Sequence, residues 1–266
     1  MNKYSKLRAQ LVKYKRVLLA YSGGVDSTFL LHAAVKTLGR ENVLAVTAVS
    51  ETYPKSELVL AKKLVKKLGA RHKFIHTNEL RNKKFADNPA QRCFYCKNEL
   101  FSKLAALAKR NKMTLLDASN HSDLSDFRPG SRAGLKWKVK SPLKEIKMTK
   151  IEIRKLSKRL GLPTWNMPAQ ACLASRVPYG MRITKQRLSK IEKGEAFIKK
   201  LGFDDVRLRD HGDIARIEFG KGLLRKLAFG GKIEKMSAYL RKLGWHYITV
   251  DADGYRTGSL NVFLKA

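Results

Sequence analysis

Ser22-Gly23-Gly24-Val25-Asp26-Ser27 lies between a run of apolar residues and a stretch with helical spacing. The run Arg16–Tyr21 predicts a buried strand, and Thr28–Val35 repeats its apolar residues as an amphipathic helix does. Two glycines at a strand-to-helix junction let backbone N–H groups close on an anion, while serine hydroxyls and the positive end of the helix dipole favour its negative charge. The stretch therefore predicts a phosphate-binding loop, although six residues alone leave an ordinary turn as the alternative.

The chemistry expected at this loop follows from a comparison with two known phosphate-binding motifs. It has neither the lysine nor the four-residue spacer of a Walker A motif, which argues against a kinase-like or GTPase-like site. It agrees at every position with SGGxDS and thus resembles the PP-loop of ATP pyrophosphatases. That resemblance implies that ATP is split into AMP and pyrophosphate while a substrate oxygen is activated by adenylation.

Length and composition limit the other possibilities. A chain of 266 residues has room for two modest domains with real hydrophobic cores. No apolar run reaches the roughly 18 residues of a membrane span, and Met1-Asn2-Lys3-Tyr4 leads into no signal-peptide core. We therefore expect a cytoplasmic protein without a membrane partner. Three cysteines argue against a disulfide framework and favour metal ligation or thiol chemistry.

The net charge is extreme, since 56 lysines and arginines against 22 aspartates and glutamates give +34. Such a charge attracts nucleic acid or any polyanion. The basic residues are nevertheless scattered over almost every predicted helix, as in Lys62-Lys63 and Lys199-Lys200, rather than gathered in one tail. This distribution favours a solvated lysine-rich surface over a dedicated RNA-binding face, and nucleic acid is a possible but unexpected partner.

The first part of the chain alternates between strand and helix. Strands are predicted at 43–49, 73–76 and 114–118, with helices at 56–68 and 96–109. This alternation predicts an α/β fold with a doubly wound, mostly parallel sheet. The resemblance of the loop implies that this fold is of the PP-loop or adenine nucleotide α-hydrolase type. Ligands of such sheets bind beyond the carboxyl ends of the strands, where the loop, Glu51 and residues 120–128 fall. We assign residues 1–165 to this ATP pyrophosphatase domain.

The pattern changes after the predicted helix 150–160, whose capping box begins at Thr149 and which stops at Gly161-Leu162-Pro163. Helices are predicted at 184–201 and 232–243, and strands at 205–209, 214–219 and 245–251. Residues 166–266 are therefore predicted to form a smaller C-terminal α+β domain for substrate binding or oligomerisation.

All the cysteines lie in two motifs, Arg92-Cys93-Phe94-Tyr95-Cys96-Lys97 and Ala171-Cys172-Leu173-Ala174-Ser175-Arg176. Three thiolates leave a zinc site one ligand short, unless a histidine or carboxylate completes it. They suffice for a cubane iron–sulfur cluster that keeps one iron open to an outside ligand, and their spacing departs from the four-cysteine ferredoxin patterns. Three unrelated buried cysteines are the structural alternative.

With both motifs in view, the sequence resembles the LarE family of ATP-dependent sulfurtransferases, which build the nickel-pincer nucleotide cofactor of lactate racemase. The resemblance runs nearly from end to end. Besides the loop and the cysteine motifs, it rests on Asp126–Gly130, Ser141-Pro142-Leu143 with Lys150, Val177–Gly180, Glu195, Arg207, Arg209–Gly212, Arg216-Ile217-Glu218 and Asp253–Asn261.

The resemblance implies a two-stage reaction on pyridinium-3,5-biscarboxylic acid mononucleotide. ATP adenylates a carboxylate, and a sulfur nucleophile then displaces AMP to leave a thiocarboxylate. Some members sacrifice the sulfur of one cysteine, at the position of Cys172, whereas others hold a 4Fe–4S cluster on three cysteines. Because Cys93, Cys96 and Cys172 are all present, we favour the cluster-dependent version and keep sacrifice of Cys172 as the alternative.

Residue roles follow from chemistry and resemblance together. ATP, with Mg²⁺ organised by Asp26, is expected at Ser22, Gly23, Gly24, Asp26, Ser27, Asn120, Asp123 and Asp126. The substrate is expected at Ser175, Arg176, Glu195, Arg207 and Arg209, since guanidinium groups suit dianions. The structural alternatives are a dipole-favoured aspartate at 26, turn residues at 120–126, a helix-surface glutamate at 195 and a solvated strand face at 207 and 209.

Two other functions compete with this hypothesis. A PP-loop tRNA thiolase with a cluster on three cysteines would explain the charge of +34. A basic RNA-binding protein on a PP-loop scaffold would need no catalysis. The resemblance also implies a homo-oligomer, a trimer or a hexamer, whereas neither the sulfur donor nor the presence of a downstream racemase can be derived from the sequence.

Overall fold

The computed structural model describes residues 2–125, 129–168, 171–220, 222–223, 231–256 and 258–259. The chain divides into two compact units, each described here by itself. The first consists of Met1–Glu79 and Gln91–Gln170, and the second of Leu80–Ala90 and Ala171–Ala266. The second unit thus contains a short segment that lies far upstream of the rest of it in the sequence.

A four-stranded parallel sheet with the order β3-β2-β1-β4 forms the centre of the first unit. Its strands are β1 (Val17–Ala20), β2 (Val43–Val49), β3 (Arg71–His76) and β4 (Thr114–Leu116). Leu18 of the central strand β1 lies in register with Leu44 on one side and Leu115 on the other. Strand β1 is almost wholly apolar and buried, as a strand covered on both faces must be.

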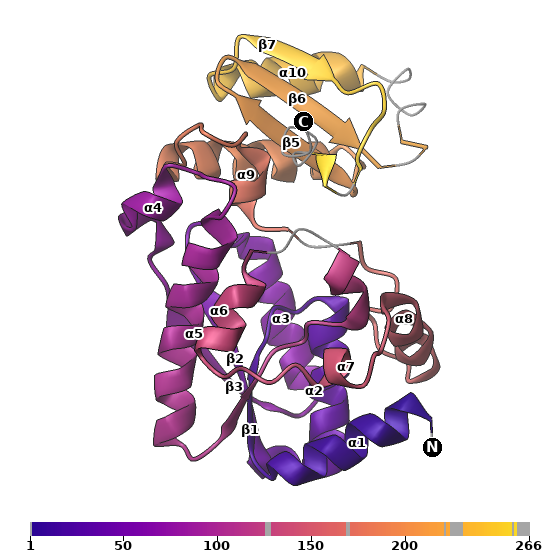
Figure 1. Ribbon diagram of the computed structural model, residues 1–266. Coiled ribbons are helices and arrows are strands. Elements are labelled where there is room, and N and C mark those ends of the chain that lie inside the picture. Colours follow the sequence, from indigo (N-terminus) through magenta and orange to yellow (C-terminus); the bar gives the residue numbers. More distant parts are fainter. Residues whose placement is uncertain are drawn as a thin grey trace. The chain divides into compact units, whose positions relative to one another are not determined.

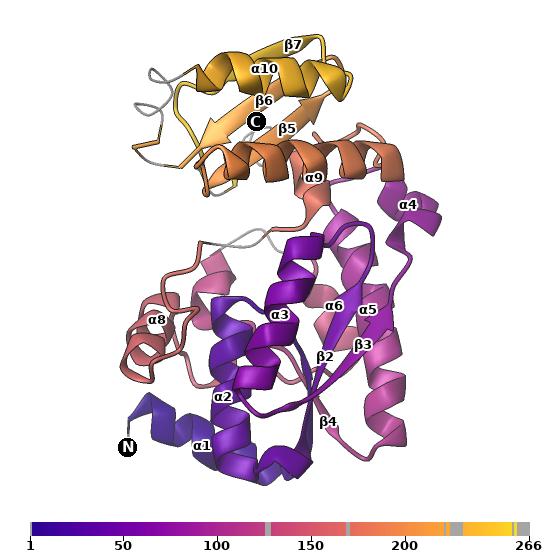
Figure 2. The ribbon, with the colours of Figure 1, turned by 180° about the vertical axis from the view of Figure 1, so that it is seen from behind.

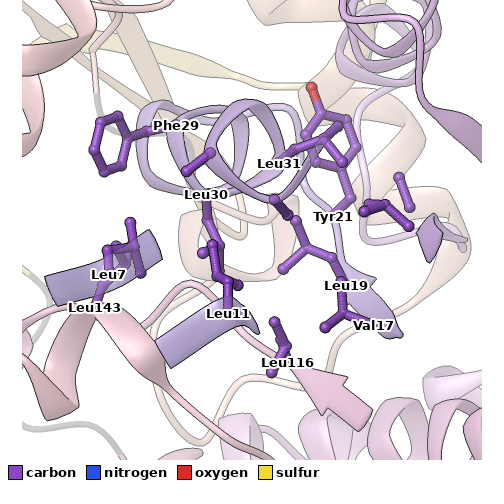
Figure 3. Packing of buried hydrophobic residues seen from close by; sticks show 14 of the residues in the cluster. Leu7, Leu11, Val17, Leu19, Tyr21, Phe29, Leu30, Leu31, Leu116 and Leu143 are labelled. Carbon is purple, nitrogen blue, oxygen red and sulfur yellow. The ribbon is translucent and has the colours of Figure 1, made fainter. Parts of the chain in front are cut away.

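Helices cover both faces of this sheet, as Figures 1 and 2 show. One face packs against α1 (Lys3–Tyr14), α2 (Val25–Leu38), α3 (Lys55–Lys67) and α8 (Lys150–Arg159). The other packs against α5 (Arg92–Arg110) and α6 (Ser131–Lys136). Figure 3 shows Leu7 and Leu11 of α1 gathered with Leu30 of α2 and Leu116 of β4. The predicted doubly wound α/β fold is confirmed.

Shorter helical segments connect these elements. They are the α-helices α4 (Lys83–Ala86) and α7 (Pro142–Glu145) and the 3-10 turns η1 (Arg40–Asn42), η2 (Glu79–Arg81), η3 (His121–Ser125) and η4 (Leu173–Arg176). The sequence patterns misplace one important boundary. Helix α5 begins at Arg92, four residues before the predicted start at Cys96, so that both cysteines of the first motif are helical.

The second unit is built on the three-stranded sheet β5-β6-β7, formed by β5 (Val206–His211), β6 (Ile214–Phe219) and β7 (Tyr247–Val250). Strands β5 and β6 are antiparallel, whereas β6 and β7 are parallel. Helices α9 (Lys185–Lys200) and α10 (Lys232–Lys242) pack on it and on each other. A Cβ at Gly194 would lie 2.3 Å from Leu208 Cδ2, so only glycine allows α9 this close to β5. The predicted small α+β unit is confirmed in its elements.

Asn88 explains why the segment 80–90 belongs to the second unit. Its side chain is fully buried and its amide donates to the carbonyl groups of Val177, Pro178 and Met181, at 3.2, 2.6 and 2.9 Å. The main chain adds a hydrogen bond from Ile183 N to Ala86 O at 2.8 Å. One buried amide thus contacts three carbonyls of the 177–181 segment, and this local polar junction ties the two stretches of the second unit together.

Within the part of the chain that the structure describes, no helix is both long enough and apolar enough to cross a membrane.

Candidate functional site

The glycine-rich loop connects the end of β1 to the start of α2, with Gly24 as the N-cap residue of the helix. Gly23 has a φ of +73°, and a Cβ there would lie 3.2 Å from the Cβ of Ala61 on α3. Both the left-handed backbone and the close approach of α3 therefore require glycine at position 23. No side chain caps the N-terminus of α2. The first N–H groups of the helix are thus available to an anion.

The hydroxyl groups of the loop face one another. Ser22 Oγ and Ser27 Oγ are 3.2 Å apart, and Ser27 Oγ donates to Gly24 O at 3.2 Å. The hydroxyl of Tyr53 donates to the carbonyl of Ser22 and ties the loop to the segment after β2. These contacts hold neutral donors around the helix N-terminus, an arrangement suited to phosphate oxygens.

Asp26, the second residue of α2, forms an ion pair that the sequence analysis does not anticipate. Lys150 Nζ lies 2.7 Å from Asp26 Oδ2, and both side chains are partly exposed. Lys150 is the first residue of α8, whose start is held by a capping box between Thr149 and Glu152. The N–H of Lys150 also donates to Ser122 Oγ at 3.1 Å. The ammonium group therefore comes from a firmly anchored backbone position.

The predicted nucleotide residues after β4 form a local turn. Asn120 is buried, and its Oδ1 accepts a hydrogen bond from Ser122 N at 2.9 Å. Asp123 Oδ2 accepts one from Asn120 N at 3.0 Å. These two contacts fit the structural alternative of turn residues, although Asp123 also lines a cavity of about 390 Å³ beside α6. Asp126 lies outside the described residues.

The two cysteines of the first motif lie near the N-terminus of α5. Cys93 and Cys96 are three residues apart, so they lie on neighbouring positions of one helix face. Cys96 Sγ lies 3.6 Å from Oε1 of Glu79, a buried carboxylate that also accepts from the hydroxyls of Ser50 and Thr52. Sequence reasoning missed Glu79, because only its position shortly after β3 distinguishes it from a surface glutamate.

Cys172 belongs to the second unit, directly before η4. All three cysteines lie within the described residues, and none forms a disulfide. Across those same residues, no group of three or more histidine, cysteine, aspartate or glutamate side chains is gathered as a metal site requires.

Arg176 holds the backbone around Cys172. Its guanidinium forms a bidentate pair with Glu195, at 2.8 and 3.1 Å, and donates to the carbonyls of Ala171 and Cys172 at 2.6 and 3.0 Å. Burial alone would raise the pKa of Glu195, but the charge and hydrogen bonds of Arg176 and a hydrogen bond from Leu208 N outweigh it and hold that pKa below its ordinary value. Glu195 is 4% exposed, so the alternative of a helix-surface glutamate is wrong.

A second buried pair joins the strands. Arg209 Nη2 lies 2.6 Å from Glu218 Oε2, while Arg209 Nη1 donates to the carbonyl of Ser175 at 2.7 Å. Glu218, which the sequence analysis quotes only as part of a motif, also pairs with Arg216 at 3.1 Å. Arg207 is buried as well and lies 4.6 Å from the ring of Tyr255. The alternative of a solvated strand face is therefore wrong for Arg207 and Arg209.

The second unit thus joins four of the five predicted substrate residues, Ser175, Arg176, Glu195 and Arg209, through ion pairs and hydrogen bonds. The fifth, Arg207, lies two residues before Arg209 on β5. The connections run through Ser175, whose carbonyl accepts from Arg209 and whose hydroxyl accepts from Arg176. Most of the guanidinium donors are already engaged within the protein. What the structure provides is a rigid, buried, positively and negatively charged framework around the Cys172 segment.

Comparisons with known proteins agree with this division. The family model described as NAD synthase matches residues 3–120, which include the loop and all four strands of the parallel sheet. An NH(3)-dependent NAD(+) synthetase of Chlorobaculum tepidum is 30% identical over 55% of this chain and 53% of its own length. The similarity to NAD synthases is therefore a property of the nucleotide-binding half.

Two relatives match through both units. An uncharacterized protein of Synechocystis sp. is 37% identical over 98% of this chain and 97% of its own length. The pyridinium-3,5-bisthiocarboxylic acid mononucleotide synthase of Lactiplantibacillus plantarum is 35% identical over 97% of this chain and 94% of its own length. The part of the second unit that begins at Ala171, which the NAD synthase model does not reach, is thus shared with these proteins.

Proposed function

Because this chain belongs to the LarE-like family of ATP pyrophosphatases, which is related to NAD synthase, we propose that it is an ATP-dependent sulfurtransferase. Its substrate is pyridinium-3,5-biscarboxylic acid mononucleotide, of which one carboxylate becomes a thiocarboxylate for nickel-pincer cofactor biosynthesis. The observation that carries the proposal is the 35% identity over 97% of the chain to a synthase whose name specifies the bisthiocarboxylic product.

The activation half of the reaction is assigned to the loop. The N–H groups at the start of α2 and the hydroxyls of Ser22 and Ser27 bind the phosphates of ATP, since unsatisfied helix donors and the dipole favour negative charge there. Asp26 supplies a carboxylate oxygen of the kind that Mg²⁺ prefers. The metal, when bound, would neutralise phosphate charge. Adenylation then converts a poor electrophile, the carboxylate, into an acyl phosphate with AMP as a good leaving group.

The sulfur half is assigned to the three cysteines. Thiolates are suitable iron ligands, and Cys93 and Cys96 lie on one helix face near an N-terminus, where the dipole favours their negative charge. Cys172 would complete a 4Fe–4S cluster, which when bound would present sulfide to the activated carboxylate. Arg176 supports either version of the chemistry, because it donates to the carbonyl of Cys172 itself and orients that residue.

The substrate carboxylates and phosphate are assigned to Ser175, Arg176, Glu195, Arg207 and Arg209. This assignment is supported by the contacts that connect Ser175, Arg176, Glu195 and Arg209 beside Cys172, with Arg207 buried on the same strand as Arg209. Because Glu195 and Glu218 neutralise two of these arginines, the framework positions a substrate without presenting an unbalanced cluster of positive charge.

Pyrophosphate release tests the activation half. Purified protein should release pyrophosphate from ATP only when the carboxylated mononucleotide is present, and mass spectrometry should find one oxygen of that mononucleotide replaced by sulfur. Pyridine mononucleotides without the ring carboxylate serve as the control. Release without the carboxylate would contradict the proposed substrate. No release with any carboxylated mononucleotide would contradict the proposal and favour a non-enzymatic protein.

A separate measurement decides the source of sulfur. Anaerobically purified and reconstituted protein should contain iron and acid-labile sulfide, and Cys93→Ser should lose both. If the protein holds no iron and instead loses the mass of one H₂S after turnover, Cys172 is the sacrificed residue.

The net charge of +34 favours one other candidate, a PP-loop tRNA thiolase. Non-specific phosphate contacts weaken steeply up to about 200 mM salt, so binding of bulk tRNA that survives this salt concentration would favour that activity. Weak, strongly salt-dependent binding would instead reflect a lysine-rich surface.

A further inference from the structure

Glu79 is buried next to Cys96, and the reaction described above gives this carboxylate no role. We propose that Glu79 and Cys96 form a binding site for a single thiophilic divalent cation, such as Fe²⁺ or Zn²⁺. The site lies wholly in the first unit and needs neither ATP nor the mononucleotide. Only its use, as the place where the first iron ion of the proposed cluster binds, rests on the proposed function.

The carboxylate of Glu79 has one satisfied and one unsatisfied oxygen. Its Oε1 accepts from Ser50 Oγ at 3.1 Å and from Thr52 Oγ1 at 3.2 Å, whereas its Oε2 is buried and has no hydrogen-bond partner. Within the described residues, no lysine, arginine or histidine forms an ion pair with Glu79. A buried carboxylate without a cationic partner is energetically costly, and a bound metal ion would supply the missing positive charge. The two hydroxyls fix the orientation of the carboxylate, as hydrogen bonds do for carboxylates that bind metals.

The distance between the two side chains is that of two ligands on one metal ion. Cys96 Sγ lies 3.6 Å from Glu79 Oε1. A tetrahedral zinc ion binds thiolate sulfur at about 2.3 Å and carboxylate oxygen at about 2.0–2.2 Å, which places the two ligand atoms about 3.5–3.7 Å apart. A thiolate ligand favours zinc and iron over Mg²⁺ and Ca²⁺. On binding, the thiol of Cys96 releases its proton to water, and its sulfur donates an electron pair to the metal.

The pair of side chains suits one ion and not an iron of a finished cubane cluster. Each iron of such a cluster is bound by three sulfides and one outside ligand, so Cys96 and Glu79 cannot share it. Among the described residues, no third histidine, cysteine, aspartate or glutamate side chain joins the two. Water therefore completes the coordination, and the partly exposed Cys96 gives an ion access. Such an open site is suited to an ion that is passed on during cluster assembly.

Cobalt spectroscopy tests the site in a protein that cannot assemble the cluster. In Cys93→Ser/Cys172→Ser, where Cys96 is the only cysteine, Co²⁺ should produce a thiolate-to-cobalt charge-transfer band that saturates at one ion per protein. Zn²⁺ should abolish this band by displacing Co²⁺, whereas the same concentration of Mg²⁺ should not. Adding Glu79→Gln should weaken Co²⁺ binding at least tenfold, because the amide keeps the shape of the side chain and loses its charge. The matched control is Glu41→Gln, which removes an exposed carboxylate of the same unit and should leave the affinity unchanged.

Absence of the band, or an unchanged Co²⁺ affinity in Glu79→Gln, would overturn the proposal and leave the contact as a weak S–H···O hydrogen bond. If Glu79→Gln does not fold, Glu79→Asp replaces it. This variant keeps the charge but withdraws the carboxylate by one methylene, so the Co²⁺ affinity should fall several-fold, and an unchanged affinity would overturn the proposal. The titrations contain no ATP, mononucleotide or sulfide. A failure of cluster assembly or of pyrophosphate release in the unmodified protein would therefore contradict the proposed function without altering these results.

Discussion

The glycine-rich loop of the first unit and the arginine framework of the second both place charge beside a predicted reaction step, but they do so in opposite ways. In the loop, one ion pair joins Lys150 to Asp26, with side chains 32% and 23% exposed. In the framework, the corresponding values are 3% and 6% for Arg176 and Glu195, and 5% and 0% for Arg209 and Glu218.

This difference separates groups that can change partners from groups that cannot. A partly exposed ion pair contributes about 0–1 kcal/mol to the free energy of unfolding, because water can replace either partner at little cost. Breaking a buried pair leaves an uncompensated charge and costs about 3–5 kcal/mol. The loop is therefore suited to binding and releasing a ligand, whereas the framework is suited to holding the backbone around Cys172 in one position.

The largest expected effect lies in the framework. Arg176→Met leaves Glu195 buried without its partner and should lower the free energy of unfolding by about 3–5 kcal/mol in urea denaturation. The matched control is Arg182→Met, which breaks an exposed pair with Asp87 in the same unit and should cost at most about 1 kcal/mol. Equal losses of unfolding free energy in the two variants would contradict the distinction between buried and exposed ion pairs on which this comparison rests.

A smaller effect is expected in the loop, where shape matters more than charge. Gly23→Ala should weaken ATP binding by at least tenfold, measured by calorimetry, because the added methyl group meets Ala61 and the residue must keep a left-handed backbone. Gly39→Ala shares the positive φ but meets no atom within 4 Å. It should cost about 1–3 kcal/mol in stability and leave ATP binding intact.

The smallest effect concerns acid stability of the first unit. Burial, with a contribution from Lys62, lowers the pKa of His72 from 6.5 to about 4. Between pH 6.5 and about 4, His72 therefore binds a proton in the unfolded chain but stays neutral in the folded protein. The stability that is present above pH 6.5 is lost progressively as the pH falls towards 4.

His72→Gln should reduce the drop in the urea midpoint between pH 7.5 and pH 5. His246→Gln, an exposed histidine of the second unit, is the control and should leave the drop unchanged. An undiminished drop in His72→Gln would show that acid sensitivity originates elsewhere.

The sequence patterns predict regular elements well where burial and periodicity agree. The predicted strand 214–219 has the bounds of β6, and the capping box at Thr149 begins α8 as expected. The patterns fail where a contact between residues far apart in the sequence determines the local structure. The predicted helix around Cys96 starts too late because residues 92–95 carry no capping signal, and the segment 80–90 carries no sign that Asn88 will be buried among carbonyls almost 90 residues away.

For the candidate site, the local sequence shows which residue types are present but not which side chains contact one another. A glycine-rich turn between strand and helix is a local arrangement, because the conformation of Gly23 and the dipole of α2 depend on adjacent residues. By itself, therefore, the sequence determined the doubly wound α/β fold, the loop and the family. Only the tertiary structure decided that Asp26 meets Lys150, Arg176 meets Glu195 and Cys96 meets Glu79. Such pairs join residues 17–124 positions apart, and their energies depend on burial, which no local pattern of residues fixes.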